Sequence, residues 1–259
     1  MANEIITFGQ GYKLSSGIKV FVQSAKKVCN NVTIICSGLS KDLTEYLEAN
    51  DVNLVDAKEL ALKHNVQTNI SPYTLKVIYF YLYTKHYSSA SDVYLCDFTD
   101  IYFQKSPFEL LQNTKPYVTS ENHYICNCET NTTWIKLCYN NDIYNLLKKY
   151  QIINGGSILG NRETVVGLLK EMCADMTQII SRIGNYQNID QASLNKTVYF
   201  DQYRYNILSN FEIMNMAHFG NAKVGLGKDA ITINGNVPHV IHQYDVIKNL
   251  ESELYVNHQ

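Results

Sequence analysis

The segment Val93-Tyr-Leu-Cys-Asp-Phe-Thr-Asp-Ile-Tyr-Phe-Gln104 places two aspartates between runs of apolar and aromatic residues. Its first four residues have the apolar and aromatic character of a buried strand, and Asp97 follows that strand directly. In open α/β sheets, ligands bind in the crevice beyond the carboxyl ends of the strands. The position of Asp97 therefore predicts a ligand site at the end of this strand.

The residues that precede this segment alternate between strand patterns and helix patterns. Strands are predicted at 5–8, 32–36 and 52–55, and helices at 17–28, 40–47, from Asp56 onward and from Ser71-Pro72 to His86. Serine, aspartate and proline occupy the positions that they favour at helix N-termini. Strands separated by helices predict a parallel sheet with helices on both faces.

The residues after the segment are less regular. Their patterns predict a short helix at 107–111, strands at 117–120 and 152–159, and helices at 134–150, 161–180 and 190–198. Asn234-Gly235 stands between two apolar runs and predicts a hairpin over 231–242, followed by a last helix from Asp245. No repeat or low-complexity linker interrupts the chain, so one α/β domain over residues 1–259 is expected.

Composition narrows the class of protein. The chain has 259 residues, 46% of them hydrophobic and 18% charged, as is ordinary for a soluble globular protein. A net charge of −2 without a basic tract gives no reason to expect a nucleic-acid partner. We see no secretory signal and no run of about 18 apolar residues, so a cytoplasmic protein without a transmembrane segment is expected, and peripheral membrane association stays open.

The seven cysteines are an odd set, and several lie within apolar stretches, which favours reduced thiols over disulfides. Cys126, Cys128 and Cys138 lack a CxxC spacing and a fourth ligand nearby. Structural zinc requires four closed nitrogen or sulfur ligands, so a zinc site is not expected here.

The three-residue spacing of Asp97 and Asp100 brings their carboxylates together if the chain turns after Asp97. Two such groups repel each other unless a cation joins them. Oxygen ligands suit Mg²⁺ or Mn²⁺, which keep positions open for phosphate oxygens and water. The alternative from spacing alone is that Asp100 caps a turn and Asp97 accepts backbone hydrogen bonds.

The stretch Asp97-Phe-Thr-Asp-Ile-Tyr-Phe-Gln-Lys-Ser-Pro-Phe108 resembles the D-x-x-D segment of nucleotide-sugar glycosyltransferases of the GT-A fold, a variant of their DxD motif. Three further segments resemble that family in the expected order. They are Asn154-Gly-Gly-Ser-Ile-Leu-Gly160, Asp190-Gln-Ala-Ser-Leu-Asn195 and Val240-Ile-His-Gln-Tyr-Asp245. The resemblance covers the chain from about Ile5 to Asp245. It implies a single Rossmann-like α/β domain, with residues 1–104 binding the nucleotide sugar and residues 105–259 binding the acceptor.

The resemblance implies a metal site made of Asp97, Asp100 and His242, which would hold Mn²⁺ or Mg²⁺ against the two phosphates of the donor. The cation would neutralise charge on the departing nucleoside diphosphate. Which aspartate contacts the metal directly is open, since Asp97 could act through water or bind the ribose. His242 could instead be an ordinary hydrogen-bonded histidine, with His239 as the reserve ligand, although strand periodicity points His239 the other way.

Donor contacts are predicted at the end of the first strand and on the helix before the motif. Thr7, Gly9 and Tyr12 lie where the resemblance places the base and ribose, although a tight turn with a surface tyrosine would give the same pattern. The segment is no dinucleotide fingerprint, because G-x-G-x-x-G fails after Gly11. Lys76 is expected near the donor phosphates or sugar, its alternative being a solvated helix lysine.

The sugar side of the site is predicted from the later motifs. Asn154, Gly155 and Gly156 interrupt an apolar strand, which indicates a bulge or a close ligand. The resemblance places this segment beside the donor sugar, with the Asn154 amide on its hydroxyls. Asp190 and Gln191 would contact sugar or acceptor, and Asp190 would be the base in an inverting enzyme. An ordinary N-cap is the alternative for Asp190.

These expectations add up to a metal-dependent glycosyltransferase that moves a sugar from a nucleoside-diphosphate sugar to an acceptor hydroxyl of a glycan or glycoconjugate. The Asn154 and Asp190 segments are somewhat more similar to the retaining glycogenin-like group than to inverting enzymes. Two alternatives remain: a non-catalytic nucleotide-sugar or carbohydrate-binding module, and a haloacid-dehalogenase-type phosphohydrolase. The latter expects D-x-D-x-(T/V) near the N-terminus, whereas here Thr99 stands at the third position of a late motif. Donor sugar, base, acceptor and oligomeric state are not indicated.

Overall fold

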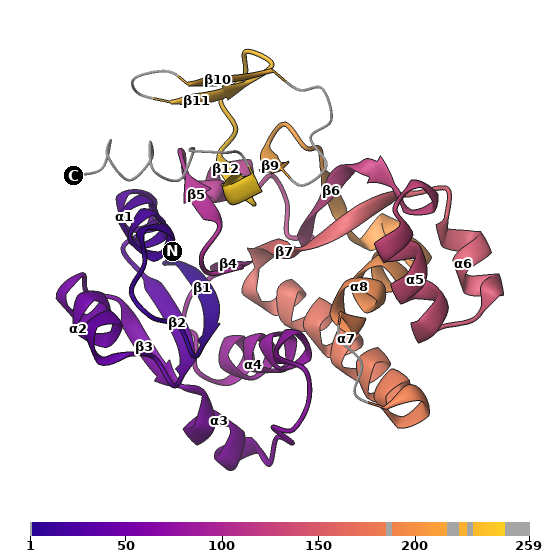
Figure 1. Ribbon diagram of the computed structural model, residues 1–259, viewed down its shortest axis with the longest axis horizontal. Coiled ribbons are helices and arrows are strands. Elements are labelled where there is room, and N and C mark those ends of the chain that lie inside the picture. The colour runs from indigo at the N-terminus through magenta and orange to yellow at the C-terminus, as the bar shows by residue number, and fades with distance from the viewer. Residues whose placement is uncertain (1, 185–187, 217–222, 227–229, 247–259) are drawn as a thin grey trace.

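Seven strands form the central sheet of the computed structural model, which describes residues 2–184, 188–216, 223–226 and 230–246 (Figure 1). In spatial order they are β3 (Asn53–Asp56), β2 (Val32–Ser37), β1 (Asn3–Gln10), β4 (Asp92–Cys96), β7 (Gln151–Asn161), β6 (Tyr117–Tyr124) and β8 (Asn206–Leu208). The neighbours from β3 to β4 pair in parallel, as do β6 and β8. Only β7 runs antiparallel to its neighbours in this sheet, so the predicted mostly parallel α/β sheet is confirmed.

Adjacent residues of the central strands face opposite sides of the sheet and bury into different cores. In β1, Ile5 joins one core and Ile6 the other, and Tyr94 and Leu95 divide in the same way in β4. Because strands covered on both faces alternate between two apolar environments, their sequences read as continuous apolar runs. This is why the strand before Asp97 carries almost no polar residues.

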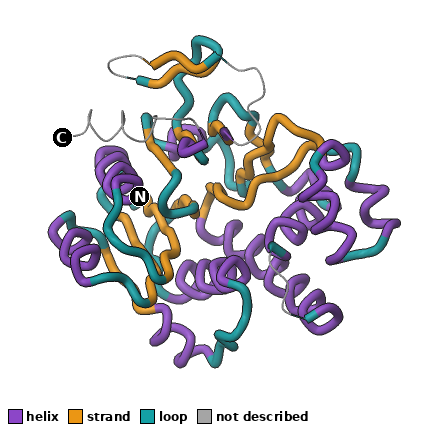
Figure 2. Tube along the Cα trace, viewed as in Figure 1, coloured by secondary structure: helices purple, strands orange, loops and turns teal. Residues whose placement is uncertain are grey.

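Helices cover both faces of the sheet (Figure 2). One core is closed by α1 (Ser16–Val28) and α2 (Lys41–Ala49), and the other by α3 (Ala57–His64), α4 (Pro72–His86), α5 (Glu129–Cys138), α7 (Arg162–Ile183) and α8 (Ile189–Phe200). The predicted helix at 134–150 is instead two helices, α5 and α6 (Asn141–Leu147). The break occurs because Asn140 Oδ1 accepts a hydrogen bond from the Ile143 N–H at 3.0 Å and starts a new helix.

The predicted hairpin at 231–242 is wrong beyond its turn. Asn234 and Gly235 have positive φ angles of 51° and 83°, and Ile233 bridges Asn236 across them, as an Asn-Gly hairpin turn requires. However, β11 (Ile231–Ile233) pairs with β10 (Val224–Leu226), and the second apolar run becomes β12 (Val240–His242) in another sheet. That sheet places β12 between β5 (Ile101–Phe103) and β9 (Ile213–Asn215).

The other predicted elements are present to within a few residues at their ends, including the turn of 3₁₀ helix at Pro107–Leu110, whereas the short strands β5, β8, β9 and β10 were not predicted. The predicted last helix from Asp245 begins as a 3₁₀ turn at Tyr244–Val246, and the rest of it lies outside the described residues. All seven cysteines are free thiols. Among the described residues, no helix is both long enough and apolar enough to span a membrane.

Candidate active site

The chain turns sharply after β4, and the turn is held by the C-terminal segment. Ile101 and Phe103 on its far side are fully buried in β5, which pairs with β12. The Gln243 N–H donates to the Asp100 carbonyl at 2.7 Å, and the buried Tyr244 hydroxyl donates to the Thr99 carbonyl at 3.0 Å. These long-range bonds fix the position of Asp97 and Asp100 relative to His242, the last residue of β12.

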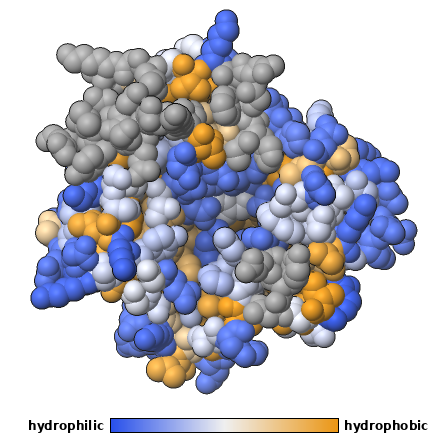
Figure 3. Space-filling model, viewed as in Figure 1, coloured by the Kyte–Doolittle hydropathy of each residue, from blue (hydrophilic) through white to orange (hydrophobic). Residues whose placement is uncertain are grey.

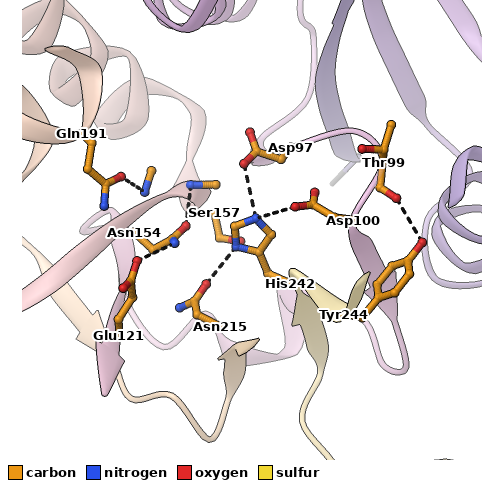
Figure 4. A network of polar contacts seen from close by, with 12 residues as sticks. Asp97, Thr99, Asp100, Glu121, Asn154, Ser157, Gln191, Asn215, His242 and Tyr244 are labelled. Atoms are coloured by element: carbon orange, nitrogen blue, oxygen red, sulfur yellow. Dashed lines mark hydrogen bonds and ion pairs between the residues drawn. The ribbon is translucent and has the colours of Figure 1, made fainter. Parts of the chain in front are cut away.

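The turn brings Asp97, Asp100 and His242 together in one cluster (Figure 4). His242 Nε2 lies 3.3 Å from Asp97 Oδ2 and 3.5 Å from Asp100 Oδ2. Burial would lower the pKa of His242, but the two carboxylates, Asp100 first, outweigh it and raise the pKa to about 10. The two carboxylates therefore favour a positive charge between them. Without a metal ion, the proton on His242 supplies that charge.

Asn215 in β9 orients the His242 ring. Its Oδ1 lies 2.9 Å from His242 Nδ1, and both side chains are almost fully buried. Because an amide oxygen only accepts, Nδ1 carries the hydrogen, which leaves the lone pair of a neutral ring on Nε2. Nε2 itself is buried and has no hydrogen-bond partner among the described residues. Nε2 therefore lies between two carboxylates: it carries the second proton of the charged ring there, and it offers its lone pair once that proton leaves.

The three residues fit a divalent cation. Their ligand atoms all lie within 4.8 Å of one another, and the distances of 3.3 and 3.5 Å from His242 Nε2 to the two carboxylates are near the roughly 3 Å expected between adjacent ligands around an ion with bonds of about 2.1 Å. Two carboxylates with one imidazole suit Mn²⁺ or Mg²⁺. The hydrogen bond from Nδ1 to an acceptor is the arrangement usual for metal-bound histidines.

Gly156 makes room for the cluster. A Cβ at this position would lie 2.2 Å from His242 Cε1 and 2.6 Å from Asp97 Oδ2. The β7 segment around it bulges away from β6, since Val118 pairs with Ile158 and the next residue, Thr119, with Asn154. The bulge predicted from the glycines is therefore present, and at Gly156 the absent side chain accommodates two of the cluster's own residues.

Lys76 in α4 is buried and paired, so the alternative of a solvated helix lysine is wrong. Its Nζ lies 2.7 Å from Asp97 Oδ1. Burial opposes the charge on Lys76, but Asp97 and then Asp190 outweigh it and raise the pKa of Lys76 well above its ordinary value. Burial likewise opposes the charge on Asp97, and Lys76 together with His242 holds the pKa of Asp97 well below its usual range.

Asp190 and Gln191 lie in the first turn of α8, facing the glycines of β7. The N-cap of α8 is Asn188, so the N-cap alternative for Asp190 is wrong. Asp190 is 6% exposed, and its Oδ1 has no hydrogen-bond partner in the described part of the chain. Burial raises the pKa of this carboxyl, partly opposed by Lys76. Gln191 Oε1 accepts from the Gly155 N–H at 2.8 Å.

The Asn154 amide is largely used within the protein. Its Oδ1 accepts from the Gly156 N–H at 2.7 Å, and its Nδ2 donates to Glu121 Oε1 at 2.8 Å (Figure 4). These two bonds shape the β7 bulge and hold a buried carboxylate beneath it. The structure thus gives Asn154 a positioning role in addition to any contact with sugar.

Two cavities meet at this cluster. One, of about 480 Å³, is lined by the ends of β1 and β4 and includes Tyr12, Thr99 and Asp100. The other, of about 270 Å³, is lined by Trp134, Asn154, Gly155, Gly156, Asp190, Gln191 and His242, among others. Tyr73, Lys76, Asp97 and Gln243 line both. Hydrophilic residues gather at the centre of the face in Figure 3, where β4, β7 and β12 meet in Figure 1.

At the end of β1, the cavity is lined by Tyr12 and by the neighbours of the other two predicted residues. Neither Thr7 nor Gly9 is among the described residues that line the two cavities, whereas Phe8, Gln10 and Tyr12 are. Thr7 is fully buried within the sheet, and a Cβ on Gly9 would lie 2.9 Å from the Phe98 ring. Packing against Phe98 is therefore a structural reason for Gly9, and the predicted contacts of Thr7 and Gly9 with a ligand stay predictions.

His239, the reserve ligand, lies apart from the cluster and faces Glu109, with 3.6 Å between His239 Nε2 and Glu109 Oε2. Sequence reasoning missed Tyr73, Glu121, Asn215 and Gln243. An acid in the buried strand at 117–121 was a signal for Glu121. Nothing in the short Ile-Met-Asn strand of β9 singles out Asn215, because its partner lies 27 residues away.

Comparison with known proteins shows the fold. No protein-family model and no curated protein sequence matches the chain. A structure of the galactosyltransferase LgtC with donor and acceptor sugar analogues superposes with a TM-score of 0.60 at 12% identity, over 98% of this chain and 95% of that one. The bifunctional glycosyltransferase WbbM gives 0.59 at 11% identity, over 99% of this chain and 49% of that one.

A third solved structure, mouse xyloside xylosyltransferase 1, gives a TM-score of 0.53 at 10% identity, over 83% of this chain and 88% of that one. At such identities a likeness in structure speaks for fold alone. The expected architecture, an α/β domain of the GT-A type, is thereby confirmed.

Proposed function

We propose that the chain is a metal-dependent glycosyltransferase that transfers a sugar from a nucleoside-diphosphate sugar to an acceptor hydroxyl. The observation that carries the proposal is the cluster of Asp97, Asp100 and His242, in which Nε2 faces both carboxylates, at the junction of two cavities. A GT-A-type fold supports this assignment, because ligands of open α/β sheets bind at such strand ends.

Asp97, Asp100 and His242 would hold the cation, Mn²⁺ or Mg²⁺. When bound, the cation supplies Lewis-acid stabilisation of the negative charge that grows on the departing nucleoside diphosphate. Lys76 adds a fixed positive charge beside Asp97 and lines both cavities, so it can bind a phosphate oxygen as a point charge. The cation and Lys76 would thus balance the negative charge of the carboxylates and of the diphosphate.

The larger cavity is the proposed place of the nucleoside, and residues 1–104 provide most of its lining. Tyr12 is 38% exposed there and packs edge-on against Phe98, with 5.4 Å between the ring centroids. Its outer face is therefore available to a base. Gln10 from β1 can hydrogen-bond the ribose or the base in the same cavity.

The smaller cavity is the proposed place of the donor sugar and the attacking acceptor. Most of the described residues lining it come from 105–259, in agreement with an acceptor half. The unpartnered Asp190 Oδ1 accepts from sugar hydroxyls, and Gln191 is held over the same space by Gly155. Trp134 lines the cavity and can stack on the apolar face of a sugar. We favour a retaining reaction, in which no dedicated base is required.

Turnover with a panel of sugar nucleotides tests the proposal. Wild-type protein incubated with Mn²⁺ and UDP-, GDP- or dTDP-sugars should hydrolyse or transfer at least one of them, and Asp97→Ala or Asp100→Ala should abolish that reaction while the circular dichroism spectrum stays unchanged. Asp142→Ala, at an exposed acid in α6, is the matched control and should keep full activity.

Three outcomes separate the proposal from its alternatives. Binding of a sugar nucleotide without any turnover would indicate a non-catalytic module. Hydrolysis of simple phosphate esters with no preference for sugar nucleotides would indicate a phosphohydrolase. The anomeric configuration of a product, determined by NMR, decides between retention and inversion.

A further inference from the structure

A third cavity, of about 390 Å³, lies beside the sugar side of the cluster. It is lined mainly by the β6 segment Ser120–Asn122, the loop and strand Ser209–Met214, and the β11 turn at Ile233 and Asn234. Glu121 lines both this cavity and the one that holds Asp190 and Gln191. None of the residues assigned above to metal or nucleotide is among the described residues of its lining.

A short series of contacts joins this cavity to the cluster. Glu121 is 4% exposed, and its Oε1 accepts from Asn154 Nδ2. Asn154 in turn accepts from the N–H of Gly156, against which His242 and Asp97 pack. The third cavity therefore lies next to the place where the donor sugar and the acceptor hydroxyl would meet, with Glu121 as the residue that lines both.

The lining indicates the class of ligand. Phe211 exposes 54% of its surface, the buried Met214 lines the same cavity, and so do Asn122 and Gln151, whose side chains carry amides. Aromatic faces bind the apolar faces of sugars, and amides bind their hydroxyls. No lysine, arginine or histidine is among the described residues that line the cavity, which disfavours phosphate and other anions. Neutral carbohydrate fits this chemistry best.

We infer that this cavity is a second acceptor subsite, which binds the next sugar along an oligosaccharide acceptor against Phe211. The inference rests on the proposed glycosyltransferase function and narrows its acceptor to a neutral glycan of at least two sugar units. A single sugar would occupy only the cavity of Asp190 and Gln191, whereas the next unit would gain contacts with Phe211, Asn122 and Gln151.

Binding of matched sugars tests the subsite. The probes are the monosaccharides glucose, galactose, mannose and N-acetylglucosamine and their linear trisaccharides, titrated by saturation-transfer NMR into full-length protein with Mn²⁺ and UDP or GDP. At least one trisaccharide should bind about tenfold more tightly than its monosaccharide. Phe211→Ala should remove roughly two- to tenfold of that affinity, as expected for one aromatic contact, without changing monosaccharide binding.

Two variants serve as controls. Phe211→Trp keeps an aromatic platform and should keep the preference for the trisaccharide, whereas Tyr203→Ala, at an aromatic 74% exposed elsewhere, should have no effect. The inference is overturned if mono- and trisaccharides bind equally, if Phe211→Ala leaves trisaccharide affinity unchanged, or if no trisaccharide of the panel binds.

Hydrolysis of the donor in the absence of acceptor keeps the two proposals distinguishable. Phe211 lines neither of the other two cavities among the described residues, so Phe211→Ala should hydrolyse the sugar nucleotide at the wild-type rate. Normal hydrolysis without a preference for trisaccharides would remove the subsite and leave the glycosyltransferase proposal intact. Loss of metal-dependent hydrolysis in the wild type would remove both.

Discussion

Asn215 decides which nitrogen of His242 faces the two carboxylates. Its Oδ1 accepts a 2.9 Å hydrogen bond from Nδ1 inside the protein, so rotating the ring or moving the proton to the other nitrogen would leave this buried oxygen unpaired. For Nε2 to bind a metal ion, the hydrogen-bond partner of Nδ1 matters as well as the two carboxylates beside Nε2. At the scale of single residues, Asn215 is therefore part of the proposed metal site.

Replacing Asn215 by Leu should weaken Mn²⁺ binding by about 10- to 100-fold, the usual cost of losing the partner of a metal-bound histidine. Asn215→Asp retains an acceptor oxygen and should bind Mn²⁺ almost as well as the wild type. Electron paramagnetic resonance of free Mn²⁺ measures both affinities without reference to turnover. Equal affinity in the wild type and Asn215→Leu would show that Nδ1 needs no partner.

The proton on His242 competes with the cation. Its pKa is raised to about 10, because Asp100 and Asp97 outweigh the effect of burial, so the ring is protonated at neutral pH until a cation displaces the proton. Apparent Mn²⁺ affinity should therefore rise by about tenfold per pH unit between pH 6 and 8, with one proton released per ion. Calorimetry in buffers of different ionisation enthalpy counts that proton, and binding without proton release would contradict this assignment.

The raised pKa of His242 makes the stability of the metal-free protein fall with pH, whereas it makes Mn²⁺ affinity rise with pH. The folded-state pKa of His242 lies above its ordinary value of 6.5. Below pH 6.5, the pairing of the charged ring with the carboxylates therefore makes its full contribution to the free energy of unfolding. This contribution is lost as the pH rises through about 10. Raising the pH should thus favour metal binding and disfavour the metal-free fold.

Among the elements, β7 shows how backbone and site depend on each other. Its bulge places Gly156 against His242 and Asp97, and the absence of a side chain leaves the space that these residues fill. Gly167 in α7 provides a contrast, since a Cβ there would meet nothing within 4 Å. Conformational freedom is not the reason for glycine at position 156; steric room is.

Gly156→Ala should abolish Mn²⁺ binding and lower the unfolding free energy by roughly 1–3 kcal/mol, as overpacking of a buried site does. Gly167→Ala should leave metal binding unchanged and stabilise α7 by up to about 1 kcal/mol. Urea denaturation together with Mn²⁺ titration measures both effects. Normal metal affinity in Gly156→Ala would mean that the cluster can move aside, and the proposed site would lose its rigidity.

The elements also show where sequence patterns succeed and where they fail. The strands from β1 to β4 were predictable because apolar runs, helix caps and glycines act within a few residues, and the same local signal found the Asn234-Gly235 turn. The pairing of the strand after that turn was predicted wrongly, because its partners, β5 and β9, are distant in sequence. Asn140 likewise broke the predicted helix at 134–150 through a single capping bond.

For the whole molecule, the candidate site is assembled from segments that only the complete fold brings together. The sequence predicted Asp97, Asp100 and His242 as a group because short motifs occur in a familiar order, whereas their separations follow from β12 inserting beside β5. Asn215, which belongs to no motif, could not be predicted, and for Glu121 the only signal was an acid in a buried strand. Their partners are set by tertiary packing, which local patterns do not record.

The three cavities lie in a row across the molecule. The proposed nucleoside cavity, the proposed sugar cavity and the proposed second acceptor subsite follow one another from the end of β1 across β4 and β7 to β6. Lys76 and Asp97 mark the first junction, and Glu121 marks the second. A donor entering from one side and a glycan from the other would meet at the cluster.

Anomalous diffraction at the manganese edge, from crystals soaked with Mn²⁺ and the sugar nucleotide that the protein turns over, tests the central claim most directly. We expect one strong peak bounded by Asp97, Asp100 and His242 Nε2, with both phosphates of the nucleotide on that ion and the sugar toward Asp190. A peak elsewhere, or a nucleotide bound without contact to this cluster, would contradict the account.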